Sequence, residues 1–316
     1  MNRCLYCYQL LGDHETDFHA TCSKKIFALP TPPEISYTET QMEELALQVV
    51  QNRITITGVQ PKISLELASG ENTKDPRRFT IVGLWGGYIL KPPTQHYAQL
   101  PEVEDLTLHL ATIAKIGVVP HSLIRLKSGN LAYITRRIDR TKNGKIQMED
   151  MCQLTEKLTE DKYQGSYEQI AKTILKYSVH PGLDVVNFFE QVLFSFLTGN
   201  ADMHLKNFSL ISQPGIGPIL SPAYDLVATA LVNPADNEDL ALTLNGKKKK
   251  LRTNDFVVAF NTLKLDFRQQ ENIFKKMERA KDKWIEFIDI SFLNYDFKEQ
   301  YKQLIRERFN RIATQK

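Results

Sequence analysis

Short runs of alternating apolar and polar residues fill the first half of the chain, and longer runs with helical periodicity fill the second half. β-branched and aromatic positions predict strands at residues 54–65, where Gly58 interrupts the run, and at residues 78–82, 84–90, 118–126 and 130–134. Apolar residues spaced three and four apart predict helices at residues 39–51, 101–116, 167–178, 184–197, 255–263, 267–281 and 288–312. The pattern therefore predicts an α+β protein with a β-rich first part and a helical second part.

A hairpin is expected at residues 240–251, because Asn245-Gly246 favours a two-residue turn between two apolar runs. Its second half carries the dense basic run from Lys247 to Lys250. Such a run is typical of a solvated hairpin arm, and it could also contact DNA, a DNA-binding partner or an acidic substrate. We assign the run no role in a site.

Composition narrows the class of protein. The 316 residues are 42% hydrophobic and 24% charged, which is typical of a globular protein. The 40 basic and 37 acidic side chains are too close to balance to require a polyanionic partner. No apolar run approaches the roughly 20 residues that cross a bilayer, and no signal-peptide pattern follows Met1. We expect a cytoplasmic protein with no membrane partner.

The strongest chemical signal follows the most apolar helix, which ends at Gly199. In the polar loop that comes next, Asp202 precedes Asn207 by five residues, the spacing of the protein-kinase catalytic loop. In that chemistry the aspartate accepts the proton of the substrate hydroxyl, the asparagine holds Mg²⁺, and Lys206 would neutralise charge on the transferring phosphate. His204 is included as a catalytic candidate, with a packed, hydrogen-bonded histidine as the alternative.

Three further residues occur in the order that a kinase requires. Asp225, which follows a Pro/Gly-rich turn, is a second candidate ligand, because carboxylate and amide oxygens suit Mg²⁺. Lys91 ends an apolar strand and could contact nucleotide phosphates, and Glu104 on the next helix is its candidate partner. The glycine turn at Gly58, Val59 and Gln60 could cradle phosphates or form a simple hairpin turn.

The N-terminus carries Cys4, Cys7, His19 and Cys22 in a C-x2-C and H-x2-C arrangement. Two turns of this kind can each present two ligands to one tetrahedral Zn²⁺. Four protein ligands leave no open position for water, so the zinc would be structural. The alternative is a small hairpin with ordinary reduced cysteines; Cys152, far away in the chain, is expected to be a core thiol.

Taken together, these motifs resemble the HipA family of bacterial toxin kinases over roughly residues 50–265. The resemblance rests on the loop from Gly199 to Ser209, together with the runs at residues 58–62, 88–92, 137–140 and 220–226. It implies a bilobal HipA-like protein kinase fold that uses ATP and Mg²⁺. The expected domains are the Cys/His knuckle at 1–30, an N-terminal β-rich lobe at 31–137, and a helical C-terminal lobe at 138–316.

The knuckle stands where longer family members have an additional subdomain, so the chain most resembles the HipT type of tripartite HipBST toxin–antitoxin systems. That resemblance implies two partners, a small HipS-like protein and a HipB-like DNA-binding antitoxin, with DNA contacted only through the antitoxin. It also implies a Ser/Thr protein kinase whose substrate is an aminoacyl-tRNA synthetase of glutamyl or tryptophanyl type. Phosphorylation of the synthetase would block translation and arrest growth.

Two further assignments come from the resemblance. Family kinases autophosphorylate a hydroxyl residue near the glycine loop, where this chain has Thr55 and Thr57 in place of the more usual serine. The segment that would hold adenine contains Thr135, Arg136 and Arg137, with arginine where longer members have glutamate. The alternative to a kinase is a catalytically weak nucleotide-binding scaffold associated with a DNA-binding antitoxin. The intact Asp202, Asn207 and Asp225 argue against that alternative.

Overall fold

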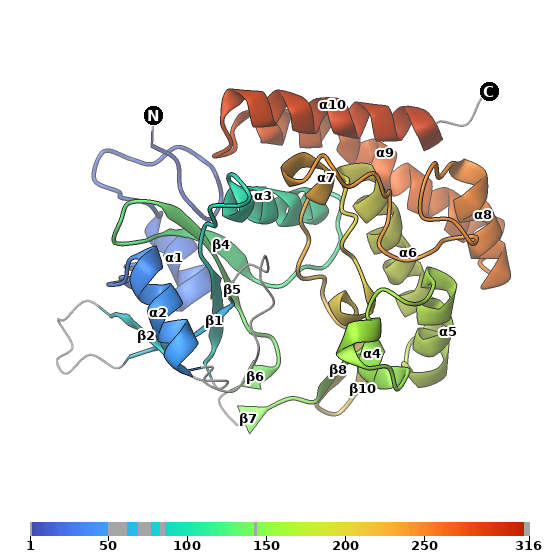
Figure 1. Cartoon of the computed structure of the whole chain (residues 1–316), viewed down its shortest axis with the longest axis horizontal. Helices are drawn as coiled ribbons and strands as arrows, with labels where there is room; N and C mark the ends of the chain where they lie inside the picture. Colours follow the sequence, from blue (N-terminus) through green and yellow to red (C-terminus); the bar gives the residue numbers. More distant parts are fainter. Residues whose placement is uncertain (1, 50–61, 69–76, 83–85, 142–143, 313–316) are drawn as a thin grey trace. The chain divides into compact units, whose positions relative to one another are not determined.

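The computed structural model describes residues 2–49, 62–68, 77–82, 86–141 and 144–312. Within these residues the chain forms two compact units (Figure 1). Unit 1 comprises Met1–Asp105, Val119–Ile138 and Ile290–Phe292, and unit 2 comprises Leu106–Val118, Asp139–Asp289 and Leu293–Lys316. Gly58, Val59 and Gln60 of the expected glycine loop, and the candidate phosphorylation sites Thr55 and Thr57, lie outside the described residues.

Unit 1 is built on an antiparallel sheet of five strands in the order β2-β1-β3-β5-β4. The strands are β1 (Ile63–Leu67), β2 (Phe79–Ile81), β3 (Tyr88–Lys91), β4 (His121–Arg125) and β5 (Leu131–Arg136). Strands are therefore present at the expected positions, with shifted ends. β4 is shorter than the expected run 118–126, β5 continues two residues past the expected end at 134, and residues 54–61 of the first expected run lie outside the described residues. In the register of the central strands, Lys91 at the end of β3 lies opposite Tyr133 of β5.

Aromatic packing holds the first helix of unit 1 to this sheet. Helix α1 (Ala20–Phe27) ends with Phe27, whose ring packs edge-on against Phe79 of β2 and at a tilt against Tyr88 of β3. The Tyr88 hydroxyl donates a hydrogen bond to the carbonyl of Ile26 at 3.1 Å. The other helices that begin in unit 1 are α2 (Glu39–Val49) and α3 (Leu100–Ile113).

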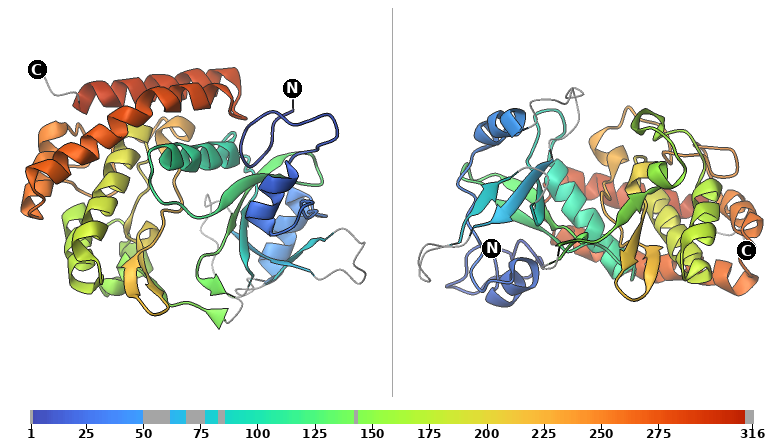
Figure 2. Two further views of the ribbon diagram at one scale, coloured as in Figure 1. Left: turned by 180° about the vertical axis from the view of Figure 1, so that it is seen from behind. Right: turned by 90° about the horizontal axis from the view of Figure 1, so that it is seen from below.

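Unit 2 is organised around α6 (Pro181–Thr198), whose last eleven residues are all buried. A helix that is apolar on all sides has to be enclosed by other elements. It packs against α5 (Tyr167–Tyr177), α9 (Phe267–Asp289) and α10 (Tyr295–Ile312), and Figure 2 shows α9 and α10 side by side. The shorter helices of the unit are α4 (Met151–Leu154), α7 (Thr229–Val232) and α8 (Thr253–Thr262). Cys152 is a buried core thiol, as expected.

Two expectations for unit 2 are wrong. The helix predicted at 288–312 starts only at Tyr295, because α9 continues to Asp289 and the Asn294 side chain accepts the backbone N–H of Phe297, starting a new helix. The hairpin predicted at 240–251 is reduced to one bridge between Leu244 and Lys247. Its turn does form, with positive φ at Asn245 (49°) and Gly246 (73°). The strand does not form because Thr243 bonds instead to the start of α5: its N–H donates to the carbonyl of Gly165, and its carbonyl accepts the N–H of Tyr167.

Small sheets also lie in unit 2. The strands β8 (Met148–Asp150), β9 (Ser209–Gln213) and β10 (Gly217–Leu220) pair in the order β10-β9-β8, and β6 (Arg140–Thr141) pairs with β7 (Gly144–Lys145). β9 directly follows the candidate catalytic loop. Across the residues that the structure describes, we find no helix that combines the length and the apolar character needed to span a membrane.

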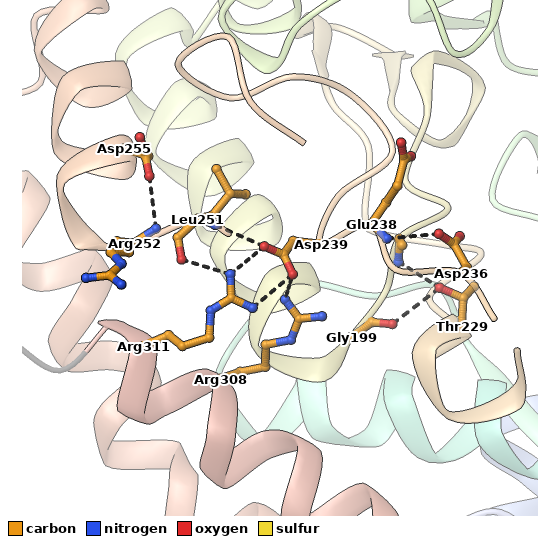
Figure 3. Close-up of polar contacts among 11 residues, drawn as sticks. Gly199, Thr229, Asp236, Glu238, Asp239, Leu251, Arg252, Asp255, Arg308 and Arg311 are labelled. Carbon is orange, nitrogen blue, oxygen red and sulfur yellow. Dashed lines mark hydrogen bonds and ion pairs between the residues drawn. The ribbon is translucent and has the colours of Figure 1, made fainter. Parts of the chain in front are cut away.

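A buried carboxylate fastens α10 to the loop before α8 (Figure 3). Asp239 accepts hydrogen bonds from Arg308, from Arg311 at 2.9 Å, and from the backbone N–H of Leu251 at 3.0 Å. Burial by itself would raise the pKa of Asp239, but the bonds from Arg311 and Leu251 and the two guanidinium charges bring it below its usual value. The cluster holds the C-terminal helix in place within unit 2.

Candidate active site

The candidate catalytic loop begins where α6 is forced to stop. Gly199 ends the helix in the left-handed conformation, with φ 71°. A Cβ at this position would lie 2.6 Å from Cδ2 of Leu304 and 3.0 Å from Cβ of Ala230, so a side chain does not fit. A glycine is therefore required both by the backbone angle and by close packing, and it directs the chain into the polar loop.

Hydrogen bonds within unit 2 hold the loop in one conformation. The amide of Asn207 donates to the backbone carbonyl of Asp202 at 2.9 Å, and Asn200 accepts the backbone N–H of Asp202 at 3.1 Å. The N–H of Ala201 donates to Oγ1 of Thr229 at 2.8 Å. Because the Asn207 nitrogen is used in this way, its carbonyl oxygen is the atom that could bind a cation. The short helix η2 (Leu205–Asn207) completes the loop.

Asp202 has a partner that the sequence did not indicate. The Tyr163 hydroxyl donates to Oδ1 of Asp202 at 2.6 Å. Burial and this bond to Asp202 raise the pKa of Tyr163, so the phenol stays protonated and donates at neutral pH. Tyr163 is 43% exposed and lies 39 residues before Asp202 in the chain, a separation with no local sequence signal. The carboxylate of the candidate base is therefore already hydrogen-bonded to a phenol at the surface of unit 2.

Lys206 also has an unforeseen partner, the carboxylate of Asp150, at 2.7 Å. Asp150 is the N-cap of α4, where its side chain accepts the backbone N–H of Gln153 in a capping box. The D-x-x-Q pattern, with apolar Met151 and Cys152 between its ends, could have marked Asp150 as a helix cap, although not as a residue next to the loop. Lys206 is thus held beside a fixed negative charge.

His204 is buried, with 5% of its surface exposed, and its ring packs edge-on against Tyr163 at 5.0 Å between centroids. Burial lowers the pKa of His204 to about 4, so the imidazole is neutral at pH 7. Its Nδ1 atom has no hydrogen-bond partner among the described residues. A neutral ring cannot stabilise negative charge as a cation, and the catalytic role of His204 stays a prediction beside the packed alternative.

Asp225 belongs to the same region of unit 2. The hydroxyl of its neighbour Tyr224 lies 2.5 Å from Oγ of Ser209 and donates to the carbonyl of Lys206 at 3.0 Å, which ties this segment to the loop. Asp225 itself has a positive φ of 54°, uncommon for a residue with a side chain. Strained backbone of this kind clusters at functional sites. The two oxygen donors proposed for Mg²⁺, from Asn207 and Asp225, are therefore carried by connected segments.

In unit 1, the ion pair expected between Lys91 and Glu104 is confirmed. Nζ of Lys91 lies 2.5 Å from Oε1 of Glu104, and the two side chains are 5% and 0% exposed. The ammonium group also lies 5.3 Å from the centroid of the Tyr133 ring. A strand lysine paired with a helix glutamate is the arrangement that positions phosphates in protein kinases.

The residues expected at the adenine segment lie at the end of β5 and just after it. The backbone N–H of Arg136 donates to Pro120 at 2.9 Å, and that of Arg137 donates to Gly87 at 2.9 Å. The hydroxyl of Thr135 donates to the backbone carbonyl of Pro120 at 2.9 Å. These donors already have acceptors in the protein, so contacts to adenine at Thr135, Arg136 and Arg137 stay a prediction.

The N-terminal residues Cys4, Cys7, His19 and Cys22 converge in unit 1. One ligand atom from each lies within 4.8 Å of the others. The sequence thus identified a real spatial cluster, and zinc binding itself stays a prediction.

The five-stranded sheet with its buried lysine–glutamate pair and the braced Asp202–Asn207 loop are features of the protein-kinase class. Within that class, the model of the HipA-like C-terminal domain family matches residues 54–284, and the chain belongs to this family. It is 34% identical over 214 residues to "Putative kinase Y4dM" of Sinorhizobium fredii, covering 63% of this chain and 50% of that protein. It is 29% identical over 210 residues to "Putative kinase" of Haemophilus influenzae, covering 63% and 59%.

Solved structures agree on the fold. A chain in the structure described as "Shewanella oneidensis MR-1 Toxin Antitoxin System HipA, HipB and its operator DNA complex" matches with TM-score 0.68 and 22% identity, over 89% of this chain and 74% of that chain. The Helicobacter pylori proinflammatory kinase CtkA matches with TM-score 0.53 and 15% identity, over 71% and 87%. The chain spans about half the length of the curated relatives it matches.

Proposed function

We propose that this protein is an ATP- and Mg²⁺-dependent protein Ser/Thr kinase. The observation that carries the proposal is the loop in which Asn207 bonds the Asp202 backbone, with the Asp225 segment joined to it through Tyr224. An isolated aspartate and asparagine would be weak evidence. Their fixed relation on one loop, with a second carboxylate on an adjoining segment, is the arrangement that phosphoryl transfer requires.

Each proposed role follows from the chemistry of the side chain. Asp202 accepts the proton of the attacking hydroxyl, and Lys206 offsets negative charge on the transferring phosphate. The carboxylate of Asp225 and the amide oxygen of Asn207 are hard oxygen donors that suit Mg²⁺, which when bound would neutralise charge on the ATP phosphates. Lys91, oriented by Glu104, would contact the phosphates of ATP.

We further propose that the kinase is the toxin of a type II toxin–antitoxin system. Support comes from the family membership and from the Shewanella HipA match, which was solved with HipB and operator DNA. By resemblance to the HipT type, the partners would be a HipB-like DNA-binding antitoxin and a HipS-like small protein. The substrate would be an aminoacyl-tRNA synthetase, and Thr55 or Thr57 would be autophosphorylated.

The alternative, a nucleotide-binding scaffold associated with a DNA-binding antitoxin, would use the lysine run as a contact surface. In unit 2, however, Lys247 pairs with Asp255 at 2.8 Å and Lys248 lies 3.5 Å from Glu238. Lys249 is bonded to Asn237. These lysines are engaged by neighbours within their own unit, which weakens the case for a dedicated DNA surface.

The decisive experiment measures transfer of labelled γ-phosphate to the protein itself and to proteins of a cytosolic lysate. We expect a labelled band of synthetase size with the wild type, and at least a thousandfold loss of transfer for Asp202→Asn. The matched control is Asp282→Asn, the same chemical change at an exposed position on α9, which should transfer like the wild type. Equal transfer by Asp202→Asn would refute the assigned base, and no transfer by a wild-type protein that binds ATP would favour the scaffold.

A further inference from the structure

We propose that Cys4, Cys7, His19 and Cys22 bind one structural Zn²⁺ and that this metal supports the helix carrying Glu104. The metal-binding step stands on the geometry of unit 1 alone. Only the importance of Glu104 for phosphate transfer rests on the kinase proposal. Two sets of contacts carry the argument, one among the four side chains and one between the knuckle and the rest of unit 1.

The spacing of the four ligand atoms fits a tetrahedral zinc ion. Nδ1 of His19 lies 3.4 Å from Sγ of Cys7 and 3.7 Å from Sγ of Cys22. Zinc with Zn–S near 2.3 Å and Zn–N near 2.0 Å would separate a sulfur and a nitrogen by about 3.5 Å at the tetrahedral angle. All four ligand atoms lie within 4.8 Å of one another, and all three cysteines are free thiols.

The orientation of His19 is that of a metal ligand. Its Nε2 atom lies 3.0 Å from the backbone carbonyl of Leu10, an acceptor, so Nε2 carries the proton. The lone pair is then on Nδ1, the atom that faces the sulfurs. Zinc-binding histidines usually donate their other ring N–H to a carbonyl or carboxylate in this way.

The turn that carries the first two cysteines is strained. The N–H of Tyr8 donates to the carbonyl of Cys4 at 2.9 Å, and Tyr8 itself adopts a positive φ of 63°. A bulky residue in this conformation is a true outlier and has to be held there by its surroundings. Binding of Cys4 and Cys7 to one ion would supply part of that constraint.

The knuckle is fixed to the sheet and to α3. The carbonyl of Leu5 accepts the N–H of Leu123 on β4 at 3.2 Å and the hydroxyl of Ser122 at 3.1 Å. The hydroxyl of Tyr8 donates to Oδ2 of Asp105 at 2.9 Å, and the Tyr8 ring packs edge-on against Phe292 at 4.7 Å. Since Asp105 directly follows Glu104 on α3, the turn next to Cys7 is bonded to the residue beside the partner of Lys91.

The first test measures metal content of the purified, fully reduced protein and the visible spectrum after exchange with Co²⁺. We expect one zinc per chain and the absorption of tetrahedral cobalt with thiolate ligands. Cys7→Ser and Cys22→Ser should lose stoichiometric zinc, whereas Cys152→Ser, a buried cysteine outside the cluster, should keep it. Zinc far below one per chain with no tetrahedral cobalt spectrum would overturn the site, as would equal loss in Cys152→Ser.

A second measurement starts from the wild-type protein, so it does not depend on whether the cysteine variants fold. It also separates this proposal from the kinase proposal. Chelation of wild-type zinc should increase hydrogen exchange of amides in α3, and added zinc should restore protection. Tyr8→Phe should keep its zinc but lose part of the protection in α3, because the substitution removes the phenol bond to Asp105 and leaves the four zinc ligands unchanged. Unchanged exchange in α3 after zinc removal would overturn the bracing. Neither readout depends on phosphate transfer, so a failed kinase assay would leave the zinc result standing.

Discussion

Two lysine–carboxylate pairs lie among the candidate site residues, one in each unit, and they differ most in burial. The side chains of Lys91 and Glu104 are 5% and 0% exposed, whereas those of Lys206 and Asp150 are 35% and 14% exposed. Two charges taken out of water depend on each other, because neither has solvent as an alternative partner. A lysine near the surface can exchange its carboxylate for water or for a ligand at little cost. The first pair is thus suited to hold geometry, and the second to move charge toward a substrate.

The largest effect is expected when the buried pair is broken. Glu104→Gln removes the carboxylate that pairs with the buried ammonium of Lys91, so the free energy of unfolding should fall by about 3–5 kcal/mol and transfer should be lost. The double variant Lys91→Met with Glu104→Leu should recover most of the stability and stay inactive. Denaturant unfolding and γ-phosphate transfer measure the two effects, with the exposed Glu278→Gln as a control. If Glu104→Gln were as stable as Glu278→Gln, the buried Lys91–Glu104 pair would not stabilise the fold.

Burial should also control the protonation of His204, which lies two residues before Lys206 in the chain. Its pKa is about 4 when folded and about 6.5 in the unfolded chain, so between these values the unfolded state binds more protons. Stability should therefore be highest above pH 6.5 and should decrease as the pH falls toward 4. Thermal unfolding across this range should show a weaker pH dependence for His204→Gln, which cannot take up the proton. An identical dependence in the variant would mean that other groups cause the loss.

Loss of the Lys206–Asp150 pair should lower activity while leaving stability almost unchanged. Lys206→Met should change the free energy of unfolding by less than about 1 kcal/mol. It should also lower transfer roughly a hundredfold, because charge stabilisation in the transition state is removed. Asp150→Asn is the matched variant, since asparagine still caps α4 while the negative charge is lost. A large loss of stability in Lys206→Met would mean that the Lys206–Asp150 pair holds the fold together as the Lys91–Glu104 pair does.

The smallest effect is expected at Tyr163. Tyr163→Phe removes only the hydrogen bond to the Asp202 carboxylate, which competes with a substrate hydroxyl for the same oxygen. We expect a two- to tenfold rise in transfer, corresponding to a net hydrogen bond of about 0.5–1.5 kcal/mol. Initial rates at low protein-substrate concentration measure this effect. A fall in transfer would instead mean that the phenol orients Asp202 for catalysis.

Sequence reasoning succeeded where the chain itself brings residues together. Asp202 and Asn207 share one loop, and Cys4 with Cys7 and His19 with Cys22 share short turns, so their proximity follows from connectivity. The Lys91–Glu104 pair was also predictable, because a strand that ends in lysine and the helix that follows it are close in sequence. The boundary of the last helix was missed because a single side chain, Asn294, starts a new helix after a break.

The sequence by itself determined the family, the order of the longer helices and of the main sheet strands, and the residue types at the candidate site, because these follow from local pattern and spacing. Tertiary structure alone decided which distant groups contact the candidate residues. Tyr163 reaches Asp202 across 39 residues, Asp150 reaches Lys206 across 56, and Tyr8 reaches Asp105 across 97. Such contacts depend on how elements pack, which periodicity along the chain does not encode. Burial follows from the same packing, and it decides that His204 is neutral and that Lys91 is held rigidly by Glu104.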